Sequence, residues 1–408
     1  MIVLYVVGSC LTKNTSANMS HNGYVQGLLE NGAEVDIVMA DDSWGKTDPV
    51  FSEWKQARYH VYRAESFKDV LRKRVRNSFD QANTSSNAVS IKENEVKKNR
   101  KISIRSVAKK LFYHLFPNDP LYPLEEKWLK TASSFKSNRE YDLVISNSSP
   151  AASHKLVSIL KSRKAIRYRK WIQIWEDPWY YDLYGGHTEA QKEEEHKLLK
   201  EADTICYVSP LTLMYQKRYF SDCSDKMCFI PLPAFDFADE DPAEYKKDTF
   251  GYFGDYYSQT RNLEPFYRAA KKIGVKAFVV GDSDLNLLSD EQIQVRPRIT
   301  LQELKEYQKK TQTLVHLCNL KGGQIPGKIY HYSITRHPIL FILDGTEDEK
   351  KQIRSFFSKY QRYVFCENNE ENIAEAMLEI TNRNAAEEEP VTDFYPKNIV
   401  ARLIEENS

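Results

Sequence analysis

The order of apolar and polar stretches in the first forty residues sets the strongest constraint on the fold. Ile2–Val7 is a short apolar run, and a polar loop covers residues 8–20. Residues 18–31 have the pattern of a helix that ends at a glycine, and residues 34–39 form the next strand-like run. Strand, loop, helix, glycine and strand in this order are typical of the start of a Rossmann-like domain. The chain is therefore expected to build an α/β fold.

The loop after the first strand should lie at the carboxyl end of the sheet, where such folds place ligands. It holds one glycine, Gly8, and so lacks the G-x-G-x-x-G fingerprint of dinucleotide binding. A dinucleotide cofactor is therefore not expected. The polar residues Asn14, Ser16 and Asn18 could line a sugar site, although ordinary loop residues are the favoured interpretation.

The length and composition indicate a soluble protein of more than one domain. With 408 residues the chain is too long for one ordinary core, so two domains are expected. The formal net charge of +1 gives no reason to expect nucleic acid as a partner. The sequence contains no run of about 18 apolar residues, so a transmembrane helix is not expected. The apolar start lacks the basic residues of a signal peptide and is interpreted as a strand, so we expect a cytoplasmic protein.

The pattern of cysteines also favours a cytoplasmic protein. No two of them form a C-x-x-C pair, and they are scattered through strand-like and loop contexts. We interpret them as reduced thiols and do not expect a zinc site. The six are Cys10, Cys206, Cys223, Cys228, Cys318 and Cys366.

A basic segment interrupts the first half of the chain, within an expected insertion at about 64–115. Residues 92–110 contain eight basic residues and two acids, and residues 104–115 place apolar side chains on one face at helical spacing. A basic amphipathic helix at 97–115 could lie on an anionic membrane surface, as a lipid-linked acceptor would require. It could equally pack on its own domain with a solvated basic face.

The stretch from residue 321 to 343 has the features of a phosphate-binding corner. Three glycines in a loop allow the backbone to approach a ligand closely. Pro326 is well placed to start a helix, and Lys328 falls in the first turn, where free N–H groups and a lysine both favour an anion. The apolar run 338–343 is then expected to be a buried strand. The alternative is an ordinary helix start with a solvated lysine.

This stretch also resembles a known family. The residues I-P-G-K-I-Y-H-Y followed by P-I-L are similar to the donor-site helix of GT-B enzymes of the glycosyltransferase family 4 type, which build capsular and other bacterial surface polysaccharides. The resemblance implies that Gly327 and Lys328 meet the donor diphosphate. His331 stands where the family has a glutamate that meets donor hydroxyls. Gly323, eight residues earlier, stands where the family has the other glutamate.

Further motifs of the same family occur in the same order along the chain. They cover stretches near residues 141–154, 170–179, 202–210 and 227–233, so the resemblance extends over the first 40 residues and from about residue 110 onward. It implies a GT-B fold, with two Rossmann-like domains facing a central cleft and a last helix that crosses back. The expected parts are a first, acceptor-side domain at 1–235, an acidic linker at 236–247, a nucleotide-sugar domain at 248–394 and the crossing helix at 395–408.

The second domain carries the remaining expected donor residues. Its first strand ends at Gly254, which should face the cleft, and Arg261 follows. The resemblance implies that Arg261 pairs with the donor diphosphate, a role that suits a guanidinium because it can donate two parallel hydrogen bonds. The letters Asp282-Ser-Asp284 match a D-x-D motif, but we interpret them as a solvated turn. No metal ion and no cofactor beyond the sugar donor is expected.

Asp177 is the candidate catalytic residue on the acceptor side. It follows Trp175 and Glu176 at the carboxyl end of an expected first-domain strand, where it could orient or deprotonate the acceptor hydroxyl. Trp175 and Trp179 could offer an apolar platform for a sugar ring. The alternative is that Asp177 and the proline after it only build a turn. His154, at an expected helix start, is interpreted as structural.

Three functions remain in view. The first is a glycosyltransferase that moves a sugar from a nucleotide-diphosphate donor to a lipid-linked or glycan acceptor, metal-independent and, on the resemblance, with retention of anomeric configuration. The second is a non-catalytic GT-B subunit that binds a partner transferase or a glycan. The third is a sugar-nucleotide epimerase of similar fold, which would need several acids and histidines in its cleft.

Overall fold

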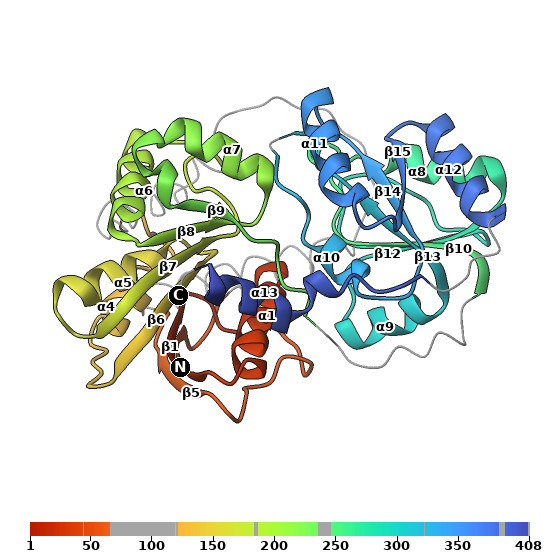
Figure 1. Ribbon diagram of the computed structural model, residues 1–408. Coiled ribbons are helices and arrows are strands. Elements are labelled where there is room, and N and C mark those ends of the chain that lie inside the picture. The colour runs from red at the N-terminus through yellow and green to blue at the C-terminus, as the bar shows by residue number, and fades with distance from the viewer. Residues whose placement is uncertain are drawn as a thin grey trace, which may run out of the picture.

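The computed structural model describes residues 1–43, 45–65, 119, 121–182, 187–235, 246–321, 323–382 and 388–406. These residues form two α/β lobes, and both marked ends of the chain lie in the same lobe (Figure 1). The expected α/β fold with two Rossmann-like domains is therefore confirmed. The basic insertion at 64–115 falls almost wholly outside the described residues.

The first domain is built on a parallel sheet with the strand order β5-β3-β1-β6-β7-β8-β9, so the chain starts in the middle and winds outward in both directions. A short antiparallel pair, β2 (Lys13–Asn14) and β4 (Lys46–Thr47), lies apart from it. The strands of the sheet are β1 (Ile2–Val7), β3 (Glu34–Ala40), β5 (Arg58–Tyr62), β6 (Glu140–Ser148), β7 (Arg167–Trp175), β8 (Thr204–Tyr207) and β9 (Met227–Phe229). Its helices are α1 (Ser16–Glu30), α4 (Glu126–Ala132), α5 (Ala152–Ser162), α6 (Glu189–Glu201), α7 (Pro210–Tyr219) and the 3₁₀ helix η1 (Ser221–Lys226).

The second domain repeats this winding with a six-stranded parallel sheet in the order β12-β11-β10-β13-β14-β15. Its strands are β10 (Lys246–Phe253), β11 (Lys276–Val280), β12 (Ile293–Arg296), β13 (Thr311–Leu317), β14 (Ile339–Leu343) and β15 (Tyr363–Glu367). Its helices are α8 (Glu264–Ile273), α9 (Leu301–Lys309), α10 (Lys328–Ser333), α11 (Glu347–Ser358) and α12 (Glu370–Asn382). In doubly wound sheets of this kind, the strand ends beside the reversal of winding direction form the ligand site.

The sequence explains why these runs become central strands. All but the first residue of β1 are buried, and every residue of β14 is buried. Parallel strands covered by helices on both faces need such continuous apolar runs. Helix α1 is capped by Thr15, the residue before it, whose side chain accepts a hydrogen bond from the Asn18 backbone N–H.

The chain returns to the first domain after the second is complete. A 3₁₀ turn, η3 (Thr392–Phe394), leads into helix α13 (Pro396–Glu405), which packs beside α1 (Figure 1). A Cβ atom on Gly27 would lie 2.2 Å from the Pro396 carbonyl oxygen, so only glycine permits this approach. The Asn31 amide also donates to the Lys397 carbonyl at 2.8 Å. The expected crossing helix is thus present.

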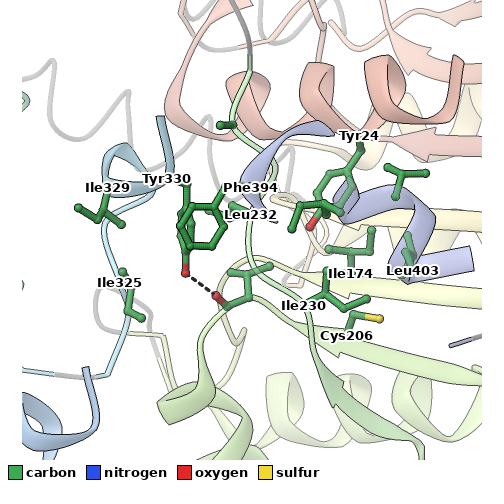
Figure 2. Packing of buried hydrophobic residues seen from close by; sticks show 14 of the residues in the cluster. Tyr24, Ile174, Cys206, Ile230, Leu232, Ile325, Ile329, Tyr330, Phe394 and Leu403 are labelled. Atoms are coloured by element: carbon green, nitrogen blue, oxygen red, sulfur yellow. Dashed lines mark hydrogen bonds between the residues drawn. The ribbon is translucent and has the colours of Figure 1, made fainter. Parts of the chain in front are cut away.

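One hydrophobic cluster is shared by the two domains. Val208, Leu211 and Leu232 of the first domain belong to the same buried cluster as Ile329 and Tyr330 of the second. Figure 2 shows Tyr330 of α10 beside Leu232 and Phe394, and its hydroxyl donates to the Val208 carbonyl at 3.3 Å. We call this group, with Ile325 and Phe394 included, the interdomain cluster. It fixes helix α10 against the first domain.

The domain limits and the expected absence of a transmembrane helix can be compared with the described residues only in part. Residues 236–245 of the expected linker lie outside the description, and β10 already begins at Lys246, so the domain limits stay predictions. Among the described residues, no helix is both long and apolar enough to span a membrane.

Candidate functional site

A cavity of about 860 Å³ lies where the carboxyl ends of the second-domain strands face the first domain. Asn14, Ser16 and Phe235 line it from the first domain, and residues that follow β10, β11, β12 and β13 line it from the second. This volume is within the usual range for small-molecule sites. All five residues expected to bind a donor border this one cavity: Gly254, Arg261, Gly327, Lys328 and His331. Their roles stay predictions.

Gly254 and Lys328 lie against each other at the cavity wall. A Cβ atom on Gly254 would lie 3.4 Å from Lys328 Cε and 3.5 Å from Nζ. The Lys328 ammonium donates to the carbonyl of Phe253, the last residue of β10. Burial, together with the charges of Arg298 and Arg261, lowers the pKa of Lys328 to about 7, and Asp255 opposes this change. The charge of Asp255 therefore compensates that of Lys328 only in part.

Arg261 follows the same glycine-bearing loop and reaches the interior of the second domain. Burial raises the pKa of Tyr252 to about 12, and a hydrogen bond and the charge of Arg261 act against this rise. Burial and, secondarily, the charge of Arg261 lower the pKa of His316 to about 3. Arg261 thus lies close to the Tyr252 and His316 rings at the wall of the cavity.

The cavity lining has an excess of cations. Its described residues include one acid, Asp255, and six cations: Arg261, Arg298, Lys305, Lys309, Lys328 and Arg336. Two of these cations pair with acids outside the lining, Lys309 with Glu306 and Arg336 with Glu389. Asp255 forms an ion pair with Arg298. An excess of fixed cations around a concave site favours an anionic ligand because the low-dielectric walls strengthen the attraction. The sequence motifs predicted two of these cations, Arg261 and Lys328. The motifs did not mark the other four, which the fold brings to the same cavity: Arg298, Lys305, Lys309 and Arg336.

His331 presents a hydrogen-bond donor to the cavity. Its Nδ1 accepts from the backbone N–H of Phe235 at 3.0 Å, so a neutral ring carries its proton on Nε2. Burial and the nearby charge of Lys328 lower the pKa of His331 to about 4, which keeps the ring neutral near pH 7. The glutamate that the resemblance would place here could only accept hydrogen bonds. His331 can therefore donate to a ligand oxygen where that glutamate would accept from a hydroxyl.

Asp177 is not among the residues that line this cavity, and it takes part in a contact between the domains. The Gln324 amide, which belongs to the loop before α10, donates to Asp177 at 2.6 Å and to Asp182 at 2.8 Å. The Asp177 side chain retains solvent access although protein surrounds it closely. Burial and the carboxylates of Asp182 and Glu176 raise the pKa of Asp177 to about 7. Such a pKa suits a residue that must accept a proton near neutral pH.

The expected tryptophan platform is wrong for Trp175. The indole is fully buried, packs on His154 with ring centroids 4.1 Å apart and donates to Gln173 at 3.0 Å. It is part of the first-domain core and has no free face, because β7 has helices on both sides. Trp179 is half-buried against Tyr122. His154 is fully buried and its Nδ1 contacts the Ser146 hydroxyl at 2.7 Å, as a structural role requires.

A buried pair at the same end of the first-domain sheet was missed by sequence reasoning. His21 of α1 and Glu176 lie 3.3 Å apart, Nε2 to Oε1, and His21 has no exposed surface. Burial raises the pKa of Glu176, and His21 opposes the rise. Asn18 orients this corner by donating to the carbonyls of Cys10 and Lys13 and by accepting from the Ser9 hydroxyl. Nothing in a single helical histidine indicates such a partner.

Asp282 and Asp284 are not part of the cavity lining, although Asp282 contacts Asp255 and Arg298, which are. Asp284 accepts from Ser258, while Asp282 accepts from the Arg298 backbone N–H, and both acids are exposed, as a solvated turn requires. In the described part of the chain, one group of side chains could supply ligand atoms to a single metal ion: His196, Asp222 and Cys223. There Lys200 already forms an ion pair with Asp222 at 3.1 Å. The absence of a metal stays a prediction.

Comparison with known proteins identifies the fold class. No protein-family model matches the chain, and no curated protein matches its sequence. Among solved structures, a glycosyltransferase from Rickettsia africae ESF-5 is similar, with a TM-score of 0.54, 11% identity and coverage of 99% of this chain and 97% of that one. UGT89C1 of Arabidopsis thaliana, complexed with UDP-L-rhamnose, has a TM-score of 0.50, 11% identity and coverage of 99% and 93%.

A third similar structure is the UDP-GlcNAc 2-epimerase of Methanocaldococcus jannaschii, with a TM-score of 0.50, 9% identity and coverage of 100% of both chains. At such low identities these likenesses establish the fold alone. The fold of the described residues is GT-B, as the sequence motifs led us to expect. The membership of family 4 in particular stays a prediction.

Proposed function

We propose that this protein is a glycosyltransferase that moves a sugar from a nucleotide-diphosphate donor to a lipid-linked or glycan acceptor in polysaccharide biosynthesis. The observation that carries the proposal is the positive cavity at the domain junction, which unites Arg261, Lys328 and His331 at the ligand end of a doubly wound sheet. Solved structures of the same fold include a glycosyltransferase and a protein complexed with UDP-L-rhamnose.

The cavity residues suit the departure of a nucleotide diphosphate. When the bond to the donor sugar breaks, negative charge builds on the leaving phosphate, and fixed cations placed there lower the barrier. Arg261 can hold the phosphate oxygens by two parallel hydrogen bonds, and Lys328 supplies a charge that Asp255 compensates only in part. His331 can donate to a donor oxygen. These groups can act without a metal ion, and retention of configuration rests on the family resemblance.

Binding of donors tests the proposal directly. We expect one nucleoside diphosphate and its sugar to bind saturably in titration calorimetry without added metal, and Arg261→Ala to weaken that binding by about tenfold or more, since a charge-assisted contact contributes roughly 1.5–3 kcal/mol. Arg268→Ala is the matched control, because Arg268 is an exposed arginine of the same domain that pairs with Glu264. If no nucleotide binds, or if both variants bind equally well, the donor site is wrongly assigned.

Asp177 is the proposed base toward the acceptor. We expect Asp177→Asn to keep donor affinity within about twofold while transfer of labelled sugar falls by roughly 10²–10⁴-fold. Because the carboxylate form is required and burial raises the pKa of Asp177 to about 7, the wild-type rate should fall as the pH drops below 7. Asp182→Asn removes one repelling charge, so it should move this fall to lower pH. A rate that is flat from pH 5 to 8 would contradict the role.

The alternatives make different demands on the same cavity. A sugar-nucleotide epimerase is favoured by the likeness to the Methanocaldococcus jannaschii structure, yet Asp255 is the one acid of the described lining, and it is paired with Arg298. Incubation with a sugar nucleotide alone decides the matter: NMR should show an unchanged sugar configuration. A non-catalytic subunit that binds a partner would be indicated by a failure of every nucleotide to bind.

A further inference from the structure

Two cysteines face each other across the last two strands of the first-domain sheet. Cys206 of β8 and Cys228 of β9 are directly opposite in the register of these parallel strands, and their sulfur atoms lie 3.3 Å apart. Neighbouring strands are about 4.7–4.9 Å apart, and a disulfide spans roughly 4.4–6.8 Å between Cα atoms. The backbone therefore already holds these two free thiols at a separation that a disulfide can bridge. We call them the cysteine pair.

The two members of the cysteine pair differ in their access to solvent. Cys206 is fully buried, in a hydrophobic cluster with Ile230 and with Leu403 of α13 (Figure 2). Cys228 packs against the same cluster and keeps partial exposure. A small molecule that arrives from solvent therefore meets the Cys228 sulfur first. Because Cys206 has no exposed surface, its sulfur is placed to react with the neighbouring Cys228 sulfur.

The surroundings favour a thiolate at Cys228. The hydrogen bond that Cys206 donates lowers the pKa of Cys228. The charges of Arg402 and Lys217 act in the same direction, whereas burial and the charge of Glu406 oppose them. The same contact and burial raise the pKa of Cys206, which therefore keeps its proton. Because the thiolate is the reactive form of cysteine, Cys228 is the nucleophile of the pair.

We propose that the cysteine pair is a modification site, at which hydrogen peroxide converts Cys206 and Cys228 into a disulfide that thiol reductants reverse. Neither cysteine lines the cavity, so the inference goes beyond the proposed function and does not depend on it. In a reducing compartment the pair is held as two thiols, which agrees with the reduced cysteines expected from the sequence.

The oxidation balances in two steps. The Cys228 thiolate attacks one oxygen of the peroxide and the O–O bond breaks. The hydroxide that leaves takes up the proton lost by Cys228 and becomes water, so that Cys228 is now a sulfenic acid. The Cys206 sulfur then attacks the Cys228 sulfur, the S–O bond breaks, and a second hydroxide leaves as water with the Cys206 proton. Two thiols thus lose two electrons, and one peroxide is reduced to two waters.

The disulfide cross-links the edge of the first-domain sheet. Strand β9 is the last in the sheet order, and the chain leaves it at Phe229 toward the second domain. Arg402 of α13 donates to the Phe229 carbonyl at 3.2 Å, so β9 also carries a contact of the crossing helix. Oxidation therefore fastens to β8 the strand from which the connection between the domains begins.

Peptide mapping after mild oxidation tests the site on the full chain. The protein is treated with an equimolar amount of hydrogen peroxide, its remaining thiols are alkylated in denaturant, and it is digested with trypsin. Trypsin places Cys206 in residues 201–217, Cys223 in residues 219–226 and Cys228 in residues 227–246. We expect a linked peptide of 201–217 with 227–246 that lacks the mass of two hydrogen atoms and that disappears in dithiothreitol.

Single substitutions separate the roles of the two thiols. Cys228→Ser should abolish the linked peptide. Cys223→Ser is the matched control and should keep it, because Cys223 is a buried thiol of the segment between the two strands. In Cys206→Ala the second step is blocked, so dimedone, a reagent for sulfenic acids, should label Cys228 several-fold more strongly than in the wild type. Circular dichroism checks that each variant folds, and mapping of the wild type needs no variant.

Other results would contradict the inference. A linked peptide that forms in urea and not in the folded wild type would show that the native structure does not permit the reaction. A link from Cys206 or Cys228 to Cys223 would show that the strand register does not select the partner. Stronger dimedone labelling of Cys206 in Cys228→Ser than of Cys228 in Cys206→Ala would mean that the nucleophile is wrongly assigned.

Discussion

Lys328→Met is expected to weaken nucleotide binding by about 10- to 100-fold and to stabilise the protein without nucleotide at the same time. The ammonium is held at the cavity wall by the Phe253 carbonyl, and burial with two neighbouring arginines lowers the pKa of Lys328 to about 7. A lowered lysine pKa means that the folded protein holds this charge at a cost. Methionine has a similar shape and carries no charge, so the cost disappears together with the contact to the phosphate.

The sign of this effect depends on pH. An unfolded lysine has a pKa near its ordinary value of 10.5, so below pH 7 both states hold the proton and the folded state carries the whole penalty. As the pH rises from 7 to 10.5, the folded protein releases the proton first and the penalty fades. Allowing for the partial solvent access of the ammonium, we expect Lys328→Met to raise the free energy of unfolding by about 1–3 kcal/mol at pH 6 and by little at pH 10.5.

Thermal unfolding at pH 6 and pH 10 and calorimetric donor binding give the two measurements. Donor affinity should fall by about 10- to 100-fold, as expected for loss of a charge-assisted contact. Lys271→Met is the control, because Lys271 is a surface lysine of α8 that pairs with Asp290, and it should change neither quantity by much. A lower melting temperature for Lys328→Met at pH 6 would show that the lysine stabilises the empty site.

Tyr330→Ala is expected to destabilise the protein by about 3–5 kcal/mol and to weaken donor binding as well. The side chain is fully buried in the interdomain cluster, where its ring packs on Phe394 with centroids 5.0 Å apart. Removing a large buried ring loses its transfer free energy and leaves a cavity. Because Tyr330 belongs to α10, which also carries Lys328, loosening the cluster should displace the donor residues.

Chemical denaturation, followed separately by tryptophan fluorescence and by bound nucleotide, checks this prediction. All six tryptophans precede residue 180, so their fluorescence reports the first domain. Tyr330→Phe keeps the ring and loses the hydrogen bond to Val208, and it should cost about 1 kcal/mol. Phe250→Ala empties a comparable buried site inside the second domain. Equal loss of donor affinity in Tyr330→Ala and Phe250→Ala would show that the interdomain cluster has no special role in placing the donor helix.

The sequence predicted the fold to a large extent because local signals were strong. The apolar run of β14 and the start of α10 near Pro326 and Lys328 lie within a few residues of each other, so their relation needed no long-range information. The motif order then gave both domains and the crossing helix. For residues 64–115 the sequence showed only basic charge and an amphipathic pattern, and their interpretation as a membrane contact stays a prediction.

The candidate site was predicted in part, and the reasons differ by residue. Arg261 and Lys328 belong to local motifs. Gln324, by contrast, acquires a role only because the fold brings its amide to Asp177, which lies 147 residues away in the sequence. Trp175 was misjudged because alternation along a strand does not show whether a face is covered by a helix.

The packing of α13 on α1 means that the first domain is assembled from two distant parts of the chain. The backbone N–H of Ala234 donates to the carbonyl of Phe394 at 2.9 Å. The segment that leaves the first domain and the segment that returns to it therefore meet at this point. Every residue of the second domain is synthesised before α13 leaves the ribosome. The close contact at Gly27 can form only then. During translation the second domain can therefore complete its core before the first domain does, because the first domain still lacks α13.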